Sequence, residues 1–239
     1  MNIIIPIAGR GSRFKEAGYK EPKPLILVKG KPMVTWATDS LPFSEPEKLI
    51  FICLREHEDQ FSISDKLYEI YSRKIKILFV EGITEGAAST VLLARDLINN
   101  DEDLIISNAD QYFVCSNLEK EIKKAKDNKN YLIPVFEATH PRWSFVKTDE
   151  KGMVLETAEK VPISNKATVG VYYFSRGADF VWAAEEMIRK DIRRNNEFYV
   201  CPVFNQLIDR GDKVKALEVE SMWSLGSPED VAYFEKYFR

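Results

Sequence analysis

Four short apolar runs, rich in β-branched residues, constrain the fold of this chain more than any other feature. They lie at residues 2–8, 48–54, 74–80 and 103–107. Runs of this kind are typical of strands that are covered on both faces. The segments between them have helical spacing of apolar residues, at 33–41, 57–71 and 87–98. This βαβα order predicts an α/β fold with a doubly wound, mostly parallel, Rossmann-like sheet, and a ligand site at the carboxyl ends of its strands.

The pattern changes after about residue 130. Strand-like segments joined by turn residues follow at 131–138, 142–149, 153–160 and 167–175. They predict an antiparallel extension in the second half. Helical patterns at 178–192 and 202–209 precede a strand at 213–220 and a terminal helix that begins at 227–230. We expect a single domain over residues 1–239, without repeats or a linker.

Composition excludes several classes of protein. The 34 basic and 37 acidic residues give a net charge of -3, so there is no bulk electrostatic reason to expect nucleic-acid binding. No window has the roughly 20 apolar residues that a membrane span needs, and we expect a cytoplasmic protein with no membrane partner. The three cysteines form no CxxC pair and there are only two histidines, which argues against disulfides and a zinc cluster.

The stretch Pro6 to Leu25 combines flexible, cationic and stiff residues directly after the first strand. Gly9 and Gly11 permit a tight backbone approach with N–H groups free to face an anion. Arg13 offers a fork of donors and Lys23 a point charge, with a proline on each side of Lys23. The spacing matches neither the dinucleotide fingerprint nor a Walker loop. The residues alone allow a phosphate cradle or a surface turn with solvated charges.

The run "AGRGSRF" followed by "PKPL" resembles the signature of the sugar-phosphate nucleotidylyltransferases, also called nucleotide-sugar pyrophosphorylases. In that family a G-x-G-[ST]-R loop and a lysine in a P-K-x-[LM] segment hold a nucleoside triphosphate. The resemblance implies that the chain joins an NTP to a sugar 1-phosphate, with Mg²⁺ as cofactor and pyrophosphate as product. It also implies an NTP-binding half at residues 1–130 and an acceptor-phosphate half at 131–239.

A second segment, "TEGAAST", resembles the family's base-recognition turn, with backbone around Gly86 and Ala87 at the nucleobase. A plain helix start capped by Thr84 or Ser89 is the structural alternative. The glutamine usual before this glycine is absent, so the base stays open. The resemblance places these residues on the nucleotide: Ala8, Gly9, Gly11, Ser12, Gly86, Ala87 and Asn108.

Asp110 follows the fourth strand in "ISNADQYF". By the resemblance it binds the catalytic magnesium, as a hard cation held by one or two carboxylates and substrate phosphates requires. Arg13, Lys23 and Asp110 are thus the expected catalytic residues. Asn108 and Asp110 could instead cap a turn.

The second half resembles the acceptor side of the family. Glu159 is expected on sugar hydroxyls, Lys160 on the sugar phosphate, and Gly170 where substrate lies close to backbone. Glu197, with Tyr199, could reach the sugar. Without the resemblance, Glu159 and Lys160 would be a solvated charge pair and the segment around Glu197 an ordinary helix start.

One position departs from the family pattern. Where many members carry a second metal-binding aspartate in W-x-D-x-G-T-P, this chain has Ser224. The metal is then held by Asp110, phosphates and water, or by another carboxylate, for which Glu218 and Glu220 are the nearby candidates.

Three other functions remain open from the sequence. The first is a cytidylyltransferase for a non-sugar phosphate such as a polyol phosphate or phosphocholine, which would use an aromatic cage drawn from Trp143, Tyr172, Tyr173 and Trp223. The others are a nucleotide-sugar glycosyltransferase and a non-catalytic sensor. Homo-oligomerisation is also left open.

Overall fold

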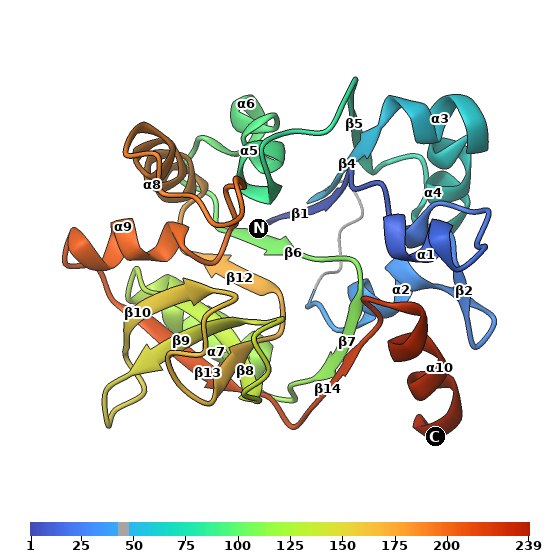
Figure 1. Ribbon diagram of the computed structural model, residues 1–239. Coiled ribbons are helices and arrows are strands. Elements are labelled where there is room, and N and C mark those ends of the chain that lie inside the picture. Colours follow the sequence, from blue (N-terminus) through green and yellow to red (C-terminus); the bar gives the residue numbers. More distant parts are fainter. Residues whose placement is uncertain (43–47) are drawn as a thin grey trace.

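The computed structural model describes residues 1–42 and 48–239, and its centre is a ten-stranded mixed sheet (Figure 1). The strands of this sheet are β1 (Asn2–Ile7), β4 (Leu49–Leu54), β5 (Lys76–Val80), β6 (Leu104–Ser107), β8 (Tyr131–Glu137), β9 (Ser144–Thr148), β10 (Val154–Glu159), β11 (Lys166–Thr168), β12 (Val171–Phe174) and β13 (Val214–Glu218). Their order is β10-β9-β11-β8-β12-β6-β1-β4-β5, with β13 paired to β8.

The sheet divides into a parallel and a mainly antiparallel part. β6, β1, β4 and β5 run parallel to one another, and β12 then joins β6 in the opposite direction. β8, β11, β9 and β10 continue with antiparallel pairs. The predicted doubly wound half and its antiparallel extension are both confirmed.

Alternation of side chains along the parallel strands produces two cores, one on each face. Ile4 and Ile50 lie in the first core, and Ile3 and Phe51 in the second. The first core is covered by α5 (Ala87–Leu92), α6 (Arg95–Ile98), α8 (Gly177–Arg189) and α9 (Val203–Asp209). The second is covered by α2 (Met33–Asp39), α4 (Ile63–Tyr71) and α7 (Leu118–Asp127). Burial on both faces explains why β1, β4 and β6 lack polar alternation. The expectation of a strand covered on both faces is wrong for β5, which lies at the edge of the sheet and is only partly buried.

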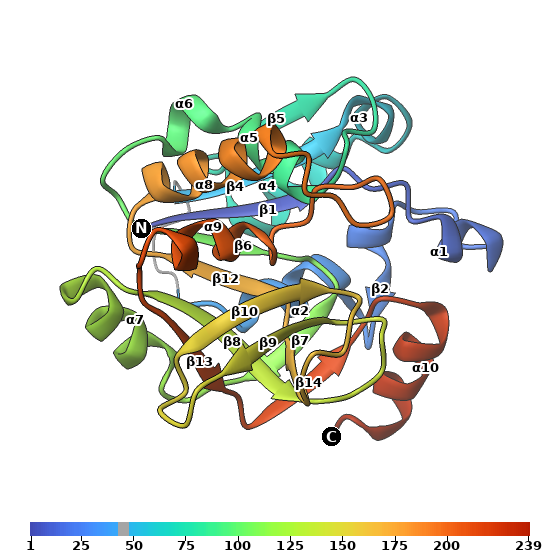
Figure 2. The same ribbon diagram turned by 60° about the vertical axis from the view of Figure 1, so that its left-hand side comes forward.

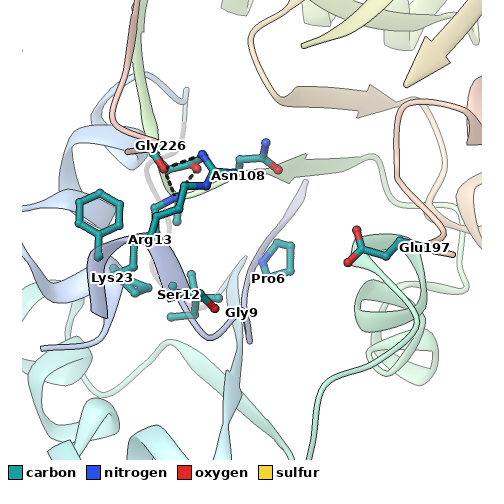
Figure 3. Close-up of a pocket in the computed structure, with 14 residues that line it drawn as sticks. Pro6, Gly9, Ser12, Arg13, Lys23, Asn108, Glu197 and Gly226 are labelled. Carbon is teal, nitrogen blue, oxygen red and sulfur yellow. Dashed lines mark hydrogen bonds and ion pairs between the residues drawn. The ribbon is translucent and has the colours of Figure 1, made fainter. Parts of the chain in front are cut away.

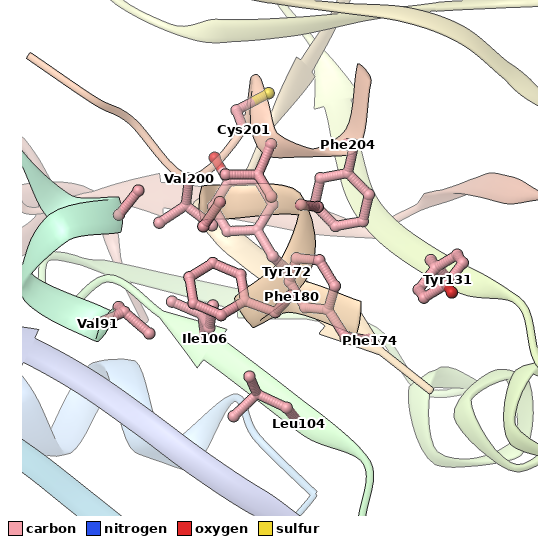
Figure 4. Close-up of a cluster of buried hydrophobic side chains, with 14 of the residues drawn as sticks. Val91, Leu104, Ile106, Tyr131, Tyr172, Phe174, Phe180, Val200, Cys201 and Phe204 are labelled. Atoms are coloured by element: carbon pink, nitrogen blue, oxygen red, sulfur yellow. The ribbon is translucent and has the colours of Figure 1, made fainter. Parts of the chain in front are cut away.

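The first core is built around aromatic rings (Figure 4). The rings of Phe174 and Phe204 stack with centroids 4.5 Å apart, and Phe180 meets Phe174 edge-on at 5.2 Å. All three side chains are buried. This packing fixes α8 and α9 against β12.

Two expected helices are interrupted. The helix expected over 57–71 becomes α3 (Arg55–Phe61) and α4, separated by Ser62 in the left-handed conformation at φ 49°. The Glu58 carboxylate accepts hydrogen bonds from the Ser64 N–H and hydroxyl, which stabilises this corner. The helix expected over 87–98 becomes α5 and α6. The helix α7 was not predicted from the sequence, because its stretch is dominated by lysine and glutamate.

A third, smaller core joins segments from both ends of the chain. It lies among α1 (Ser12–Glu16), Ile26 directly after the 3₁₀ helix η1 (Lys23–Leu25), the hairpin β2 (Leu27–Val28) and β3 (Lys31–Pro32), the start of α2, and α10 (Pro228–Tyr237). Phe14, Leu225 and Phe234 are among its buried members. A two-stranded ribbon of β7 (Gln111–Val114) and β14 (Ser221–Ser224) leads into it, with α10 beside β14 (Figure 2). None of the described helices is long and apolar enough to cross a membrane.

Replacing Phe174 by alanine is expected to lower the free energy of unfolding by about 3–5 kcal/mol, because the change leaves a cavity between two other rings. Urea titration followed by circular dichroism measures this difference. Leu155, which is 53% exposed, provides the control: Leu155→Ala should change the free energy by less than about 0.5 kcal/mol. Equal losses in the two variants would contradict the packing described here.

Candidate active site

A cavity of about 500 Å³ opens at the carboxyl ends of β1 and β6, the edge of the sheet predicted for a ligand (Figure 3). Arg13 and Lys23 are directed toward Gly226 on one side, and Glu197 lies across the cavity. The predicted residues that line it are Gly9, Gly11, Ser12, Arg13, Lys23, Asn108, Asp110 and Glu197. Ala8 is buried behind the loop and lines neither this cavity nor its neighbour.

The loop after β1 has a specific need for glycine at one position. Gly11 has φ +62°, and a Cβ placed on it would lie 3.1 Å from the Cβ of Lys23. A side chain there would push against the lysine as well as strain the backbone. Lys23 itself begins η1 between Pro22 and Pro24, so its backbone is held on both sides. Gly11 therefore allows Lys23 to pack against the loop.

Asp110 lies at the centre of the charged groups. The Lys23 ammonium donates to its Oδ2 at 2.6 Å and to the Gly226 carbonyl at 3.3 Å, and Arg13 reaches the same carbonyl at 3.5 Å. Burial raises the pKa of the Asp110 carboxyl, but the attraction of Lys23 and Arg13 outweighs burial and leaves that pKa below its usual value. Asp110 is therefore a carboxylate at neutral pH.

The ribbon of β7 and β14 brings the C-terminal turn against Asp110. Ser224 pairs with Gln111 at the end of the ribbon, and the Leu225 N–H donates to the Asp110 carbonyl at 2.7 Å. The Ser224 hydroxyl, in turn, donates to Oδ2 of Asp230 at 2.8 Å. Residues more than a hundred positions apart in the sequence thus form one wall.

The structure corrects the search for a second carboxylate. Glu218 pairs with Lys166, and Glu220 accepts hydrogen bonds from Ser116; neither glutamate lines either cavity. Asp230, in the first turn of α10, lines the second cavity. Sequence reasoning missed it because an acidic residue in "SPED" has a sufficient explanation as part of a helix start.

A second cavity, of about 260 Å³, adjoins the first and shares part of its wall. Arg13, Asn108, Asp110 and Gly226 line both. Among the predicted residues, the second cavity adds Ala87, Glu159 and Gly170. The two cavities thus meet at a shared wall that includes the Asp110 carboxylate and the Arg13 guanidinium.

The acceptor-side residues are partly where they were expected. Glu159 is buried, accepts a hydrogen bond from Ser144, and has a raised pKa, chiefly because burial disfavours its charge. Lys160 does not line either cavity; its ammonium donates to the Tyr199 hydroxyl at 2.6 Å, and Tyr199 forms part of the wall. Arg142 also lines this cavity and was not predicted.

Two glycines have structural explanations in addition to their predicted ones. Gly86, at φ +125°, would place a Cβ 2.5 Å from the Phe198 carbonyl oxygen. The flanking backbone is paired there, with Phe198 N–H donating to Glu85 and Ala88 N–H donating to Phe198. Gly170 makes room for Asn108, whose Nδ2 lies 2.5 Å from where a Cβ would be. Gly86 lines neither cavity, and Gly86 rather than Thr84 or Ser89 occupies the N-cap of α5.

The aromatic cage considered for a choline-type acceptor is not assembled. Trp143 and Tyr172 line the second cavity, but the guanidinium of Arg142 lies over the Trp143 ring at 4.2 Å. Tyr173 belongs to the core on the other face, and Trp223 packs against the third core.

The residues around Asp110 fit a hard divalent cation. Among the described residues there is no group of three or more histidine, cysteine or acidic side chains that could hold a metal by itself. The donors near the junction of the cavities are oxygens: the Asp110 and Asp230 carboxylates and the Ser224 hydroxyl. Magnesium is bound by one or two carboxylates together with substrate phosphates, and this set suits that mode.

Comparison with known proteins covers nearly the whole chain. The family model described as "Nucleotidyl transferase" matches residues 2–236. The "Bifunctional protein GlmU" of Methanocaldococcus jannaschii is 26% identical over 243 residues, covering 99% of this chain and 54% of that protein. The "UTP--glucose-1-phosphate uridylyltransferase AglF" of Haloferax volcanii is 26% identical over 239 residues, covering 96% and 93%. The chain thus spans about half the length of the first relative and most of the second.

A solved structure shares the same fold. The nucleoside-diphosphate-sugar pyrophosphorylase from Vibrio cholerae RC9 matches with a TM-score of 0.79 and 25% sequence identity. The match covers 98% of this chain and 99% of that one.

Replacing Lys23 by methionine is expected to raise the pKa of Asp110, because the carboxylate keeps its burial and loses its nearest positive charge. In the native protein the ion pair stabilises the fold at pH values above about 4, the ordinary pKa of an aspartate carboxyl. This contribution is lost as the pH falls through the lowered pKa that Asp110 has in the folded protein. Carbon-13 NMR titration of the aspartate carboxyls, with Asp110→Asn for assignment, measures the shift. Lys20→Met, at an exposed position of the same loop, should leave the titration unchanged; an equal midpoint in Lys23→Met would refute the assignment.

Proposed function

Because this chain belongs to the nucleotidyl transferase family, we propose that it transfers a nucleotidyl group from an NTP to a sugar 1-phosphate and releases pyrophosphate. One observation of the structure carries the proposal. The cavity beside the glycine loop and the cavity beside Glu159 meet at Arg13, Asn108, Asp110 and Gly226. A reaction between two separately bound phosphates needs such a junction. Residues 1–130 then supply most of the NTP side, and residues 131–239 most of the acceptor side.

The reaction requires alignment more than proton transfer. An oxygen of the acceptor phosphate attacks the α-phosphorus, a new P–O bond forms, and the bond to the β-phosphate breaks. The acceptor is already an anion at neutral pH, since the second pKa of a phosphate monoester is about 6, so no general base is needed. The protein must hold two anions together with attacking and leaving oxygens in line.

Arg13 and Lys23 suit the neutralising role. Both converge on the Gly226 carbonyl at the junction, and both line the first cavity. Their guanidinium and ammonium groups would bind the triphosphate oxygens and stabilise the charge that develops on pyrophosphate. Asp110, with substrate phosphates, would hold a magnesium ion, which when bound supplies further charge neutralisation at the phosphates.

The second cavity suits an acceptor with hydroxyl groups. Glu159 is buried in its wall with Ser144 and provides a fixed acceptor of hydrogen bonds. Lys160, whose ammonium is bound to Tyr199 in the wall of this cavity, would act at the acceptor phosphate. Glu197 instead faces the first cavity, where hydrogen-bond donors of the ribose or the base would lie. Two printed names support a sugar 1-phosphate as the acceptor class: the Haloferax volcanii relative is named for glucose 1-phosphate, and the Vibrio cholerae protein is named a nucleoside-diphosphate-sugar pyrophosphorylase.

A pyrophosphate-release assay of the common NTPs against sugar 1-phosphates and other phosphate monoesters tests the proposal. At least one pair with a sugar 1-phosphate should give magnesium-dependent release. Release only with non-sugar phosphates would redirect the assignment to the alternative acceptor class. A glycosyltransferase or a sensor would give no release from any pair.

With the pair that this assay identifies, Arg13→Ala is expected to lower kcat/KM by about 100-fold or more, since it removes a donor aimed at developing charge. Asp110→Asn should abolish magnesium-dependent turnover. Thermal unfolding of each variant checks that the fold survives, and Arg10→Ala, in the same loop but outside both cavity linings, is the matched control. Near-normal turnover by folded Arg13→Ala would remove it from the site.

A further inference from the structure

We propose that Asp230 is the second carboxylate of the metal site. It would supply the negative charge that the uncharged side chain of Ser224 does not provide. This inference rests on the proposed function, because it concerns the cation that a triphosphate brings to Asp110. The inference is based on the position and the charge of the Asp230 side chain.

Asp230 and Asp110 face a common point from two different elements. A Cβ placed on Gly226 would lie 3.5 Å from Oδ2 of Asp110 and 3.6 Å from Oδ2 of Asp230. The Ser224 hydroxyl oxygen is 3.3 Å from the same point. Three oxygens therefore lie 3.3 to 3.6 Å from one point beside Gly226, at the junction of the two cavities.

The balance of charge calls for a second carboxylate. Asp110 alone is already matched by Lys23 at 2.6 Å and is attracted by Arg13. A dication added beside those two positive groups would meet one carboxylate and at least two cations. Asp230 adds a second carboxylate to this point. Its charge is shared with Arg142, and only 16% of its side chain is exposed, so solvent screens it weakly.

The surroundings of Asp230 hold its carboxylate in place. The Ser224 hydroxyl donates to Oδ2 at 2.8 Å, and the Gly226 N–H donates to the Ser224 oxygen at 3.2 Å. Its own backbone N–H is bound by the Ser227 hydroxyl in the first turn of α10. Arg142 pairs with both carboxylate oxygens, at 3.0 and 3.3 Å. Ser224 thus acts as a positioning residue for a carboxylate six residues further along the chain.

Moving the carboxylate tests the proposal. Mn²⁺ is the probe, alone and as its complex with tripolyphosphate, and its binding is read from the enhancement of water proton relaxation when the ion is held on the protein. Asp230→Asn should weaken Mn²⁺ binding by about tenfold or more, a loss at least as large as that for removing an outer-shell partner of a metal ligand. The double variant Ser224→Asp with Asp230→Asn should restore binding to within a few fold of the native protein.

Two controls separate a direct role from a structural one. Arg142→Gln removes the ion pair and keeps the Asp230 carboxylate, so Mn²⁺ binding should persist. Glu220→Gln removes a nearby carboxylate outside both cavities and should change nothing. Native-like Mn²⁺ binding by Asp230→Asn, or failure of the folded double variant to recover it, overturns the proposal.

The result is independent of the reaction assay. Normal Mn²⁺ binding that depends on Asp230, in a protein that releases no pyrophosphate from any pair, would contradict the proposed function and leave this inference standing. Pyrophosphate release by a protein whose Mn²⁺ binding does not depend on Asp230 would support the proposed function and contradict this inference.

Discussion

The contact between Lys23 and Asp110 ties together parts of the chain that are far apart in the sequence. The two residues are 87 positions apart, and the same ammonium also reaches the carbonyl of Gly226, 203 positions further along than Lys23. A short ion pair in a partly buried setting tolerates little displacement of either partner. The loop after β1, the turn after β6 and the turn before α10 must therefore keep their positions relative to one another. The third hydrophobic core and the β7–β14 ribbon supply the packing that holds these segments in place.

Two carboxyls on the cavity walls have pKa values shifted in opposite directions for a physical reason. Asp110 has cations in contact, so its pKa is lowered in spite of burial, whereas Glu159 has mainly a hydroxyl partner, and burial raises its pKa. A group that stays ionised suits a cation or a phosphate-binding lysine. A group whose ionisation is disfavoured suits hydrogen bonds to an uncharged ligand.

Much of this arrangement could be predicted from local sequence. The buried parallel strands were visible as apolar runs, and the loop residues Gly9 to Lys23 follow β1 so closely that their place at the carboxyl edge was determined by it. Asp230 and Arg142 could not be found in that way, because their proximity depends on α10 folding back against the loop before β9. Helix breaks at Ser62 and near Ala94 were also missed, since apolar spacing continues across them while the backbone changes direction. The sequence around Gly170 predicted close approach of a substrate. In the structure, the Asn108 side chain lies in the space that a side chain at Gly170 would need.

The backbone pairing of Phe198 with Glu85 and Ala88, on either side of Gly86, connects the walls of both cavities. Hydrogen bonds from Phe198 to Glu85 and from Ala88 to Phe198 join the turn before α5 with the irregular segment that carries Glu197 and Tyr199. Gly86 permits this contact only because it has no side chain. These bonds hold the two segments against each other. Glu197 lines the first cavity and Tyr199 the second, so a mutation that reshapes the turn before α5 is expected to alter both cavities at once.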